Sequence, residues 1–458
     1  MVHYTIQNDK PIRKFELHPG QRTIDCYCVL SYLYKLFITL LLDQNHMIQF
    51  ERFTLANGLR VIVHRDTSTP MAVVNVMYDV GARDEDPGRT GFAHLFEHLM
   101  FGGSVHIENY DEPLQMAGGE NNAYTTNDLT NYYIQLPAEN IETAFWLESD
   151  RMLSLAFSEK SLDLQRKVVC EEFKEHYINK PYGDAWHKMR ELAYEVHPYR
   201  WMTIGKELSH VEKAKLEDVK NFFFKFYRPV NAILVVAGNV TLEQAKQLSE
   251  KWFGDIPAGT KYDRHLPQEP LQTKARRQEV KADVPLDALY KAWHISSRLD
   301  KKYYSMDLIT DILSGGGSSR LYHSLVKEKK LFSNIECYHF GSIDRGLIAI
   351  EGKLVKGIKM EDAEKAVDEE LEKMKGELVS EMELQKVKNK TESTIAFEDM
   401  SVMNRANSLA FYELLGDAEL MNTELEKYAA ITREDILDES RNIFRDENSS
   451  TLYYYSNN

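Results

Sequence analysis

Residues 91–104 read GFAHLFEHLMFGGS, and this stretch says more about the fold and the chemistry than any other part of the chain. Its apolar residues recur at helical spacing, and the paired glycines at its end are typical of a helix terminus, so a helix is expected at 92–101. Positions four residues apart lie on one face of a helix, so His94 and His98 can both point at one ion. Glu97 lies beside that face. The stretch therefore predicts two zinc ligands, His94 and His98, and a catalytic base, Glu97.

A catalytic zinc ion is usually held by three protein residues, so the two histidines need a further ligand. A second helix, expected at 161–177, offers Glu171, Glu172 and Glu175. Glu172 lies one turn beyond two valines and so stays near an inward-facing apolar stripe. Spacing alone leaves the choice among the three glutamates open.

The flanking segments predict an α+β chain. Asn57-Gly58 between apolar runs indicates a hairpin, with strands at 53–55 and 59–63. Patterns of apolar residues predict further strands at 71–80, 131–136 and 232–237, and further helices at 141–156 and 242–253. A polar stretch with Pro and Gly then runs to about residue 274 and is typical of a linker.

The second half of the chain repeats the order of the first. A strand at 286–294 is followed by a helix at 302–313 and by three glycines at 315–317. When the glycines that end the two predicted helices are aligned, the His94, Glu97 and His98 positions correspond to Asp307, Thr310 and Asp311. The pattern predicts an internal duplication in which one copy alone carries the chemistry.

Composition limits the class of protein. The chain has 458 residues, which favours two or more domains, and a net charge of -15, which argues against a nucleic-acid partner. Four cysteines, Cys26, Cys28, Cys170 and Cys337, form no disulfide framework and fit a reducing, cytoplasmic location.

The first 46 residues differ from the rest of the chain. Residues 26–42 are largely apolar but include Lys35, and they are short for a membrane span. We interpret residues 1–46 as a misassigned start or a membrane anchor. In the second case the protein would be membrane-anchored or periplasmic.

From about Met47 onward the chain resembles the insulinase-like, or pitrilysin-type, zinc metallopeptidases, a family that includes mitochondrial processing peptidase. The stretches that carry the resemblance are GFAHLFEHLMFGGS, GGENNAYTTNDLTNYYIQLP, RKVVCEEFKEHYINKPYG, HPYRWMTIGK and GGGSSRLYHSLVKEKKLF. In that family the third ligand is the Glu of an R-x-V-[VI]-x-x-E segment, which selects Glu172 here. The resemblance also implies that Asn122, Ala123 and Tyr124 contact extended substrate backbone, as a strand added at a sheet edge does.

The fold implied by the resemblance is α+β, with two similar α/β halves that enclose a cavity. Each half is a mainly antiparallel sheet with helices packed on it. The expected division is an extension at 1–46, a catalytic zinc-binding half at 47–256, a linker at 257–275 and a non-catalytic homologous half at 276–458. The implied activity is that of an endopeptidase with one Zn²⁺ per chain. It would hydrolyse peptides or unfolded segments through a zinc-bound water that Glu97 activates.

One departure from the family concerns partners. Family members often carry an Arg and a Tyr, seven residues apart, that grip the substrate, but Val326 and Ser333 stand at those places here. A homologous subunit is therefore expected to supply the missing pair, with a homodimer as the fallback. The alternative function is that of a non-catalytic structural or assembly subunit on the same fold. Intact His94, Glu97, His98 and Glu172 argue against it, and a purely structural zinc site usually needs four protein ligands.

Overall fold

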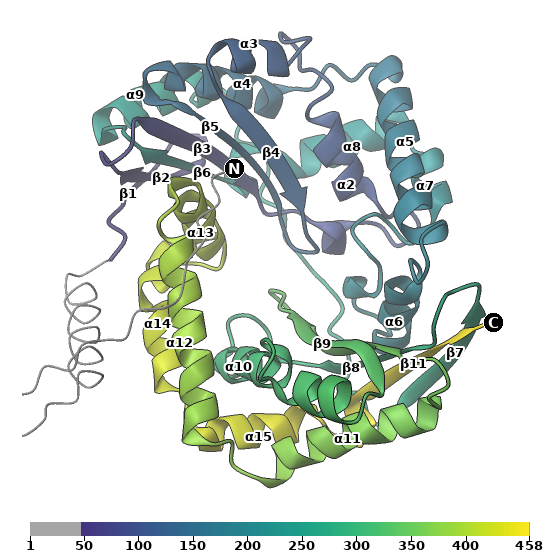
Figure 1. The fold of residues 1–458 in the computed structure, drawn as a ribbon. Helices are drawn as coiled ribbons and strands as arrows, with labels where there is room; N and C mark the ends of the chain where they lie inside the picture. The colour runs from purple at the N-terminus through teal and green to yellow at the C-terminus, as the bar shows by residue number, and fades with distance from the viewer. Residues whose placement is uncertain (1–46, 458) are drawn as a thin grey trace, which may run out of the picture. The chain divides into compact units, whose positions relative to one another are not determined.

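The computed structural model describes residues 47–457, so the interpretation of residues 1–46 lies outside the described part. Every helix and strand of the described residues belongs to one compact unit, Gln49–Asn458 (Figure 1). None of the helices within residues 47–457 has both the length and the hydropathy of a membrane span.

The first half of this unit is built on a six-stranded sheet with the order β1-β2-β6-β3-β5-β4. Its strands are β1 (Glu51–Thr54), β2 (Arg60–Arg65), β3 (Met71–Tyr78), β4 (Glu120–Thr125), β5 (Thr130–Pro137) and β6 (Ala232–Gly238). The Asn57-Gly58 turn joins β1 to β2 as predicted, since Gly58 has φ 87° and Asn57 Nδ2 donates to the carbonyl of Phe253 at 2.7 Å. Only β2 and β6 pair in parallel, and β4 lies at the edge.

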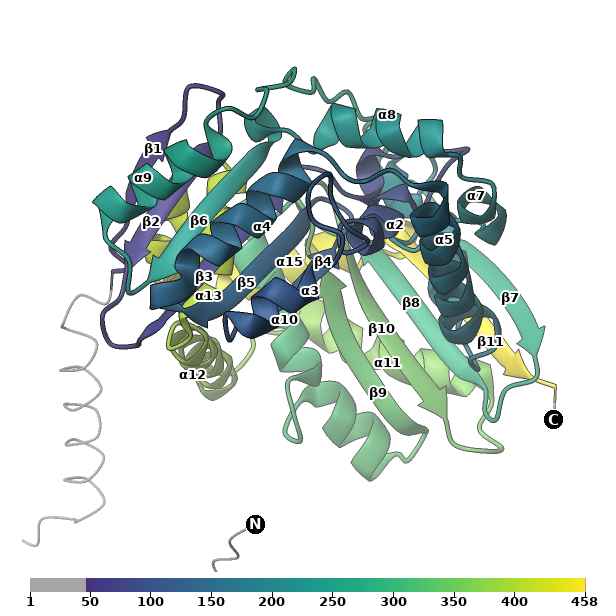
Figure 2. The ribbon, with the colours of Figure 1, turned by 90° about the horizontal axis from the view of Figure 1, so that it is seen from above.

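The helices of the first half carry the residues with predicted chemistry. They are α2 (Phe92–Leu99), α3 (Asp111–Met116), α4 (Ile141–Leu153), α5 (Glu159–Phe173), α6 (Ala185–Ala193), α7 (Leu208–Glu212), α8 (Leu216–Phe226) and α9 (Leu242–Phe253). Of these, α2, α4 and α9 contact the six-stranded sheet. A π-helical turn, Lys174–Ile178, extends α5. Ser158 and Thr241 cap α5 and α9, each accepting a backbone N–H from the first turn. Figure 2 shows α4 lying across β3 and β5, with α9 beside it.

The second half contains a five-stranded sheet with the order β7-β11-β8-β10-β9. Its strands are β7 (Arg276–Ala282), β8 (Ala288–His294), β9 (Phe332–Phe340), β10 (Leu347–Leu354) and β11 (Ser449–Ser456). Its helices are α10 (Lys302–Ser314), α11 (Met360–Gly376), α12 (Glu381–Glu398), α13 (Val402–Leu414), α14 (Glu424–Ala430) and α15 (Arg433–Ile443), and a π-helical segment covers Tyr322–Glu328.

The two sheets share one topology. Without β1, the strands of the first sheet follow the order first-fifth-second-fourth-third along the chain, and the second sheet has the same order. In each sheet the first and fifth strands pair in parallel and all other pairs are antiparallel. Helices α2 and α10 both follow the second strand of their sheet. The predicted α+β architecture of two similar halves is therefore confirmed, whereas the residue boundaries of the domains stay a prediction.

Each half lends one helix to the sheet of the other. Helix α13 packs on β3 and β6, where Asn407 Oδ1 accepts hydrogen bonds from Asn75 at 2.6 Å and Asn131 at 3.1 Å. Helix α6 packs on β8 and β11 and buries Met189 against the second sheet. Because each sheet is covered on both faces, the central strands β6 and β8 are buried along their whole length.

Candidate metal centre

Helix α2 has no capping side chain of its own at its N-terminus. Gly91 precedes it with φ 86°, and a Cβ there would meet the carbonyl oxygen of Ile204 at 2.6 Å, so only glycine fits. The cap comes instead from Glu85, whose two carboxyl oxygens accept from the N–H groups of Gly91 and Ala93, each at 2.9 Å. Trp201 Nε1 donates to the same carboxyl at 3.1 Å. Burial raises the pKa of Glu85 to about 8. Glu85 thus fixes the start of the helix that carries His94.

The apolar face of α2 packs on α8 and leaves both histidines on the other face. Phe96 stacks on Phe222 with ring centroids 5.0 Å apart and on Tyr227 at 5.1 Å. Phe96 is fully buried, whereas His94 and His98 keep 14% and 24% of their side-chain surface exposed. Burial of the apolar face therefore decides which way the two imidazoles point.

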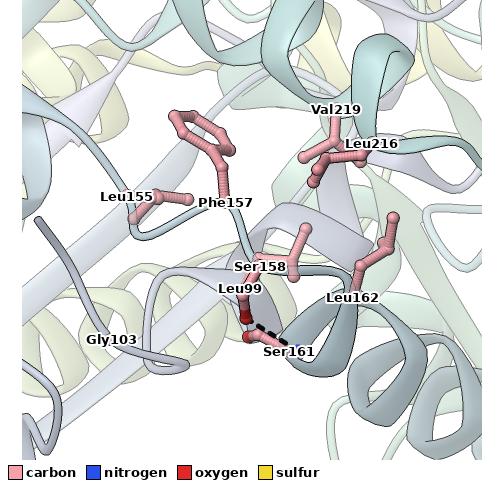
Figure 3. Close-up of a pocket in the computed structure, with 9 residues that line it drawn as sticks. All are labelled: Leu99, Gly103, Leu155, Phe157, Ser158, Ser161, Leu162, Leu216 and Val219. Atoms are coloured by element: carbon pink, nitrogen blue, oxygen red, sulfur yellow. Dashed lines mark hydrogen bonds between the residues drawn. The ribbon is translucent and has the colours of Figure 1, made fainter.

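The end of α2 packs against the start of α5 (Figure 3). Leu99, Leu162 and Val219 line a cavity of only about 10 Å³ there, too small for more than one water molecule. Ser158 Oγ accepts from Ser161 N at 3.0 Å and caps α5. This close packing holds together the two helices that bear the candidate ligands.

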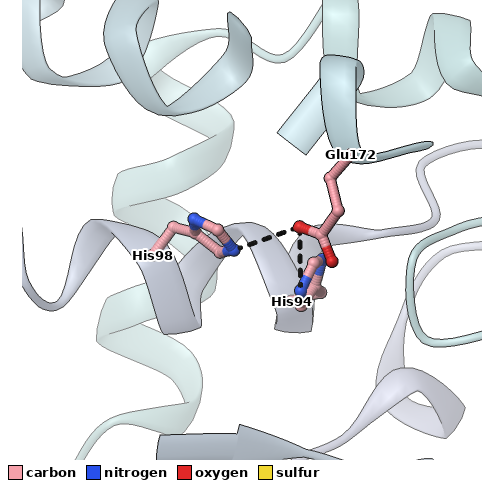
Figure 4. Close-up of side chains that lie close together, drawn as sticks. All are labelled: His94, His98 and Glu172. Carbon is pink, nitrogen blue, oxygen red and sulfur yellow. Dashed lines mark ion pairs between the residues drawn. The ribbon is translucent and has the colours of Figure 1, made fainter. Parts of the chain in front are cut away.

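The three predicted ligands converge (Figure 4). Glu172 Oε2 lies 3.7 Å from His94 Nε2 and 3.5 Å from His98 Nε2, and one ligand atom of each residue lies within 4.8 Å of the others. These separations exceed an ordinary hydrogen bond. They are close to the roughly 3.3–3.5 Å between donor atoms around a tetrahedral zinc ion with bonds of about 2.0–2.1 Å. The donor set and its spacing therefore fit one zinc ion.

The electrostatics of the cluster favour metal-binding protonation states. Burial lowers the pKa of His94, which favours the neutral imidazole. The His98 imidazole beside Glu172 is the largest cause of a lowered pKa of that carboxyl, and burial opposes it. Neutral imidazole and carboxylate are the forms that bind divalent metals.

The other two glutamates that spacing had left open face elsewhere. Glu171 pairs with Lys174 at 2.8 Å and keeps 74% of its side chain exposed, and Glu175 is exposed on the π-helical turn. Across residues 47–457, His94, His98 and Glu172 form the one group of three or more His, Cys, Asp or Glu residues with a ligand-like spacing.

The side chain of Glu97 extends from α2 to the edge strand β4. Its Oε2 accepts a hydrogen bond from Thr125 Oγ1 at 2.6 Å, and Thr125 is the last residue of β4. Asn122, Ala123 and Tyr124 precede it on the same strand and pair with β5 on one side only. The predicted substrate-binding residues therefore lie on a free sheet edge that leads to Glu97.

Sequence reasoning placed Thr125 on the strand implied to contact substrate but predicted neither its contact with Glu97 nor a role for Glu85. Strand alternation could have placed Thr125 on the same side as Ala123, but not against Glu97. Nothing in the sequence singles out Glu85, because its side chain acts on backbone groups six and eight residues away.

The corresponding helix of the second half has no comparable cluster among the described residues. Asp307 lies 2.9 Å from His339 Nε2 and accepts from the Tyr428 hydroxyl at 2.5 Å, and Asp311 pairs with Lys390 at 2.6 Å. Asp307 and Asp311, which align with His94 and His98 in the internal duplication, are thus satisfied by hydrogen bonds and ion pairs within the second half.

Comparison with known proteins agrees with this architecture. The family model described as "Insulinase (Peptidase family M16)" matches residues 60–193, and that described as "Peptidase M16 inactive domain" matches residues 213–391. The chain belongs to the insulinase family of peptidases. The inactive-domain model ends within α12 and covers most of the half whose α10 carboxylates are internally paired.

Relatives within the insulinase family are named for zinc and proteolysis. The zinc protease PqqE of Helicobacter pylori is 28% identical over 416 residues, which cover 90% of this chain and 94% of the relative. The crystal structure of a protease from Helicobacter pylori superimposes with a TM-score of 0.83 at 28% identity, over 89% of this chain and 99% of the other. The beta subunit of mitochondrial processing peptidase from Saccharomyces cerevisiae is 28% identical over 206 residues, 44% of each chain.

Proposed function

We propose that this protein is a zinc-dependent endopeptidase that hydrolyses peptides or unfolded segments. The observation that carries the proposal is the convergence of two imidazoles and one carboxylate beside Glu97, at the end of a free strand edge. Membership of a peptidase family, with relatives named zinc proteases, supports the same activity.

In the proposed mechanism His94, His98 and Glu172 hold the ion. Zinc in such a site supplies Lewis acidity, which makes a water molecule nucleophilic near neutral pH and polarises a carbonyl. Glu97 takes a proton from the attacking water and returns it to the nitrogen of the leaving amine. Thr125 orients the Glu97 carboxylate through its 2.6 Å hydrogen bond.

The substrate would bind as an added strand on β4. Because β4 pairs only with β5, an extended peptide could bond the outer edge of the segment that contains Asn122, Ala123 and Tyr124, where the Ala123 N–H donates to Asn122 Oδ1 at 2.8 Å in this structure. A strand laid along β4 runs past Thr125 and so reaches Glu97. The enzyme would then select its substrates by their ability to adopt an extended backbone, which favours unfolded segments over folded proteins.

A homologous partner subunit, or a second copy, is part of the proposal. Val326 packs against the core of the second half, and Ser333 Oγ donates to the carbonyl of Lys353 at 3.1 Å, so neither offers a substrate-gripping Arg or Tyr. A relative named as a subunit of mitochondrial processing peptidase supports pairing. The cytoplasmic location stays a prediction.

The test replaces Glu97 by Gln and measures zinc content beside cleavage of a quenched fluorogenic peptide. We expect Glu97→Gln to retain zinc and lose cleavage, because only the base is removed. Glu171→Gln, on the exposed face of α5, is the matched control and should keep both. Unchanged cleavage by Glu97→Gln would refute its role. A zinc-loaded wild type that cleaves nothing, alone or with a co-encoded homologue, would instead favour a structural subunit.

A further inference from the structure

A second cavity, of about 550 Å³, lies where the first half, the linker and the second half meet. Its volume falls in the range typical of ligand pockets. It shares no lining residue with the candidate metal centre. The lining comprises Arg83, His197, Arg264, Leu266, Pro267, Gln268, Glu269, Ser297, Ile343, Asp344 and Arg345.

His197 presents an unsatisfied donor to this cavity. The side chain is only 5% exposed, and its Nδ1 accepts the N–H of Tyr199 at 3.2 Å, so in the neutral ring Nε2 carries the proton. Within residues 47–457 that Nε2 has no hydrogen-bond partner, and Asp344 Oδ2 lies 3.4 Å away. A buried donor without a hydrogen-bond partner is unfavourable, so an acceptor on a ligand would be favoured there.

Arg345 is the arginine of the cavity whose side chain is available to bind a ligand. Its half-buried guanidinium makes no hydrogen bond or ion pair within the described part of the chain. The other two arginines of the cavity already form ion pairs, Arg83 with Asp128 at 3.0 Å and Arg264 with Asp84 at 2.7 Å. Arg345 thus provides one donor without a partner among the described residues, and His197 Nε2 provides another, whose nearby Asp344 carboxylate lies beyond ordinary hydrogen-bond distance at 3.4 Å.

The acidic lining residues narrow the choice of ligand. Glu269 is occupied, since its oxygens accept three consecutive backbone N–H groups, those of residues 195–197, at 2.7–3.0 Å. Asp344 keeps 46% of its side chain exposed, and although Arg83 lies 3.7 Å from it, its negative charge disfavours a multiply charged anion such as phosphate. Leu266, Pro267 and Ile343 add apolar lining that phosphate does not need.

We propose that this cavity binds the C-terminal carboxylate of a short peptide between Arg345 and His197, with apolar side chains of the peptide against Leu266 and Ile343. The peptide class rests on the proposed function, because a peptidase releases such carboxylates as products. Since the lining comes from both halves and from the linker, the bound peptide would bridge all three.

The test is isothermal titration of the zinc-loaded full chain carrying Glu97→Gln, so that the probe is not cleaved. The probes are N-acetyl-trialanine, its C-terminal amide and inorganic phosphate. We expect saturable binding of the free acid, at least tenfold weaker binding of the amide, and no binding of phosphate. Equal binding of acid and amide, no binding of the acid, or phosphate binding as tightly as the acid would overturn the proposal.

Three variants in that background locate the site. Arg345→Gln should weaken binding of the free acid at least tenfold, and Arg200→Gln, whose side chain does not line the cavity, should leave it unchanged. Asp344→Asn should tighten binding, because it removes a repelling charge. A merely structural disturbance would weaken binding in both Arg345→Gln and Asp344→Asn, and that result would contradict the proposal. Cleavage is not measured, so failure here leaves the proposed peptidase activity standing.

Discussion

Replacement of Thr125 by Val should slow peptide cleavage without removing the metal. The change is nearly isosteric and deletes only the hydroxyl that donates to Glu97 Oε2 at 2.6 Å. Without this hydrogen bond the Glu97 carboxylate would no longer be held against the end of β4. The three proposed ligands keep their contacts with one another.

The magnitude follows from the type of bond. A hydrogen bond to a charged acceptor contributes about 1.5–3 kcal/mol. Both side chains are half-buried, so water partly replaces the lost donor and the effect should lie near the lower value. Because about 1.4 kcal/mol corresponds to a factor of ten, we expect kcat/KM to fall roughly tenfold.

The assay compares kcat/KM of the wild type, Thr125→Val and Thr125→Ser on one fluorogenic peptide, with zinc content determined for each. Thr125→Ser keeps the hydroxyl and should stay within about twofold of the wild type. If Thr125→Val cleaves as fast as Thr125→Ser, the hydroxyl does not orient the base. If Thr125→Val loses zinc, its role concerns the metal instead.

Three further predictions follow from single contacts. Glu172→Ala should lower zinc affinity by more than about 100-fold in chelator competition, because a ligand is lost, whereas Glu171→Ala should not change it; equal losses would contradict the assignment. Glu85→Gln leaves one acceptor for three N–H donors and should lower both the melting temperature and zinc affinity; an unchanged melting temperature would argue against its capping role. Burial lowers the pKa of His294 from 6.5 to about 4, so the unfolded chain binds a proton first as the pH falls. The contribution of His294 to stability should therefore be fully present above pH 6.5 and decline down to about pH 4, by about 2 kcal/mol at pH 5. Urea unfolding at pH 7.5 and pH 5 checks this, and an equal decline in His294→Phe would refute it.

Local patterns in the sequence predicted elements of the fold as far as α10 and none beyond it. The Asn57-Gly58 turn and the Thr241 cap act on residues next to them, so hairpin and helix appear where expected. Strand β7 was missed because RRQEVKA alternates partly buried with exposed positions and lacks an apolar run. The exchange of α6 and α13 between the sheets depends on tertiary packing, and no local pattern shows it.

In the candidate site, too, some residues were predictable from local spacing and others depend on tertiary packing. His94, Glu97 and His98 lie within one helical turn or so, and spacing alone puts them on neighbouring faces. Glu172 could not be separated from Glu171 and Glu175 by spacing, because the rotation of α5 depends on how its start packs against α2. The resemblance to the family selected Glu172, and the geometry brings that residue to the histidines.

Zinc K-edge X-ray absorption of the purified, zinc-loaded chain tests most directly whether His94, His98 and Glu172 hold the ion. We predict one zinc per chain with two imidazole nitrogens and carboxylate oxygen at about 2.0–2.2 Å, and loss of the imidazole scattering in the His94→Ala, His98→Ala double variant. A sulfur ligand at about 2.3 Å, or a spectrum unchanged by that double substitution, would contradict the account.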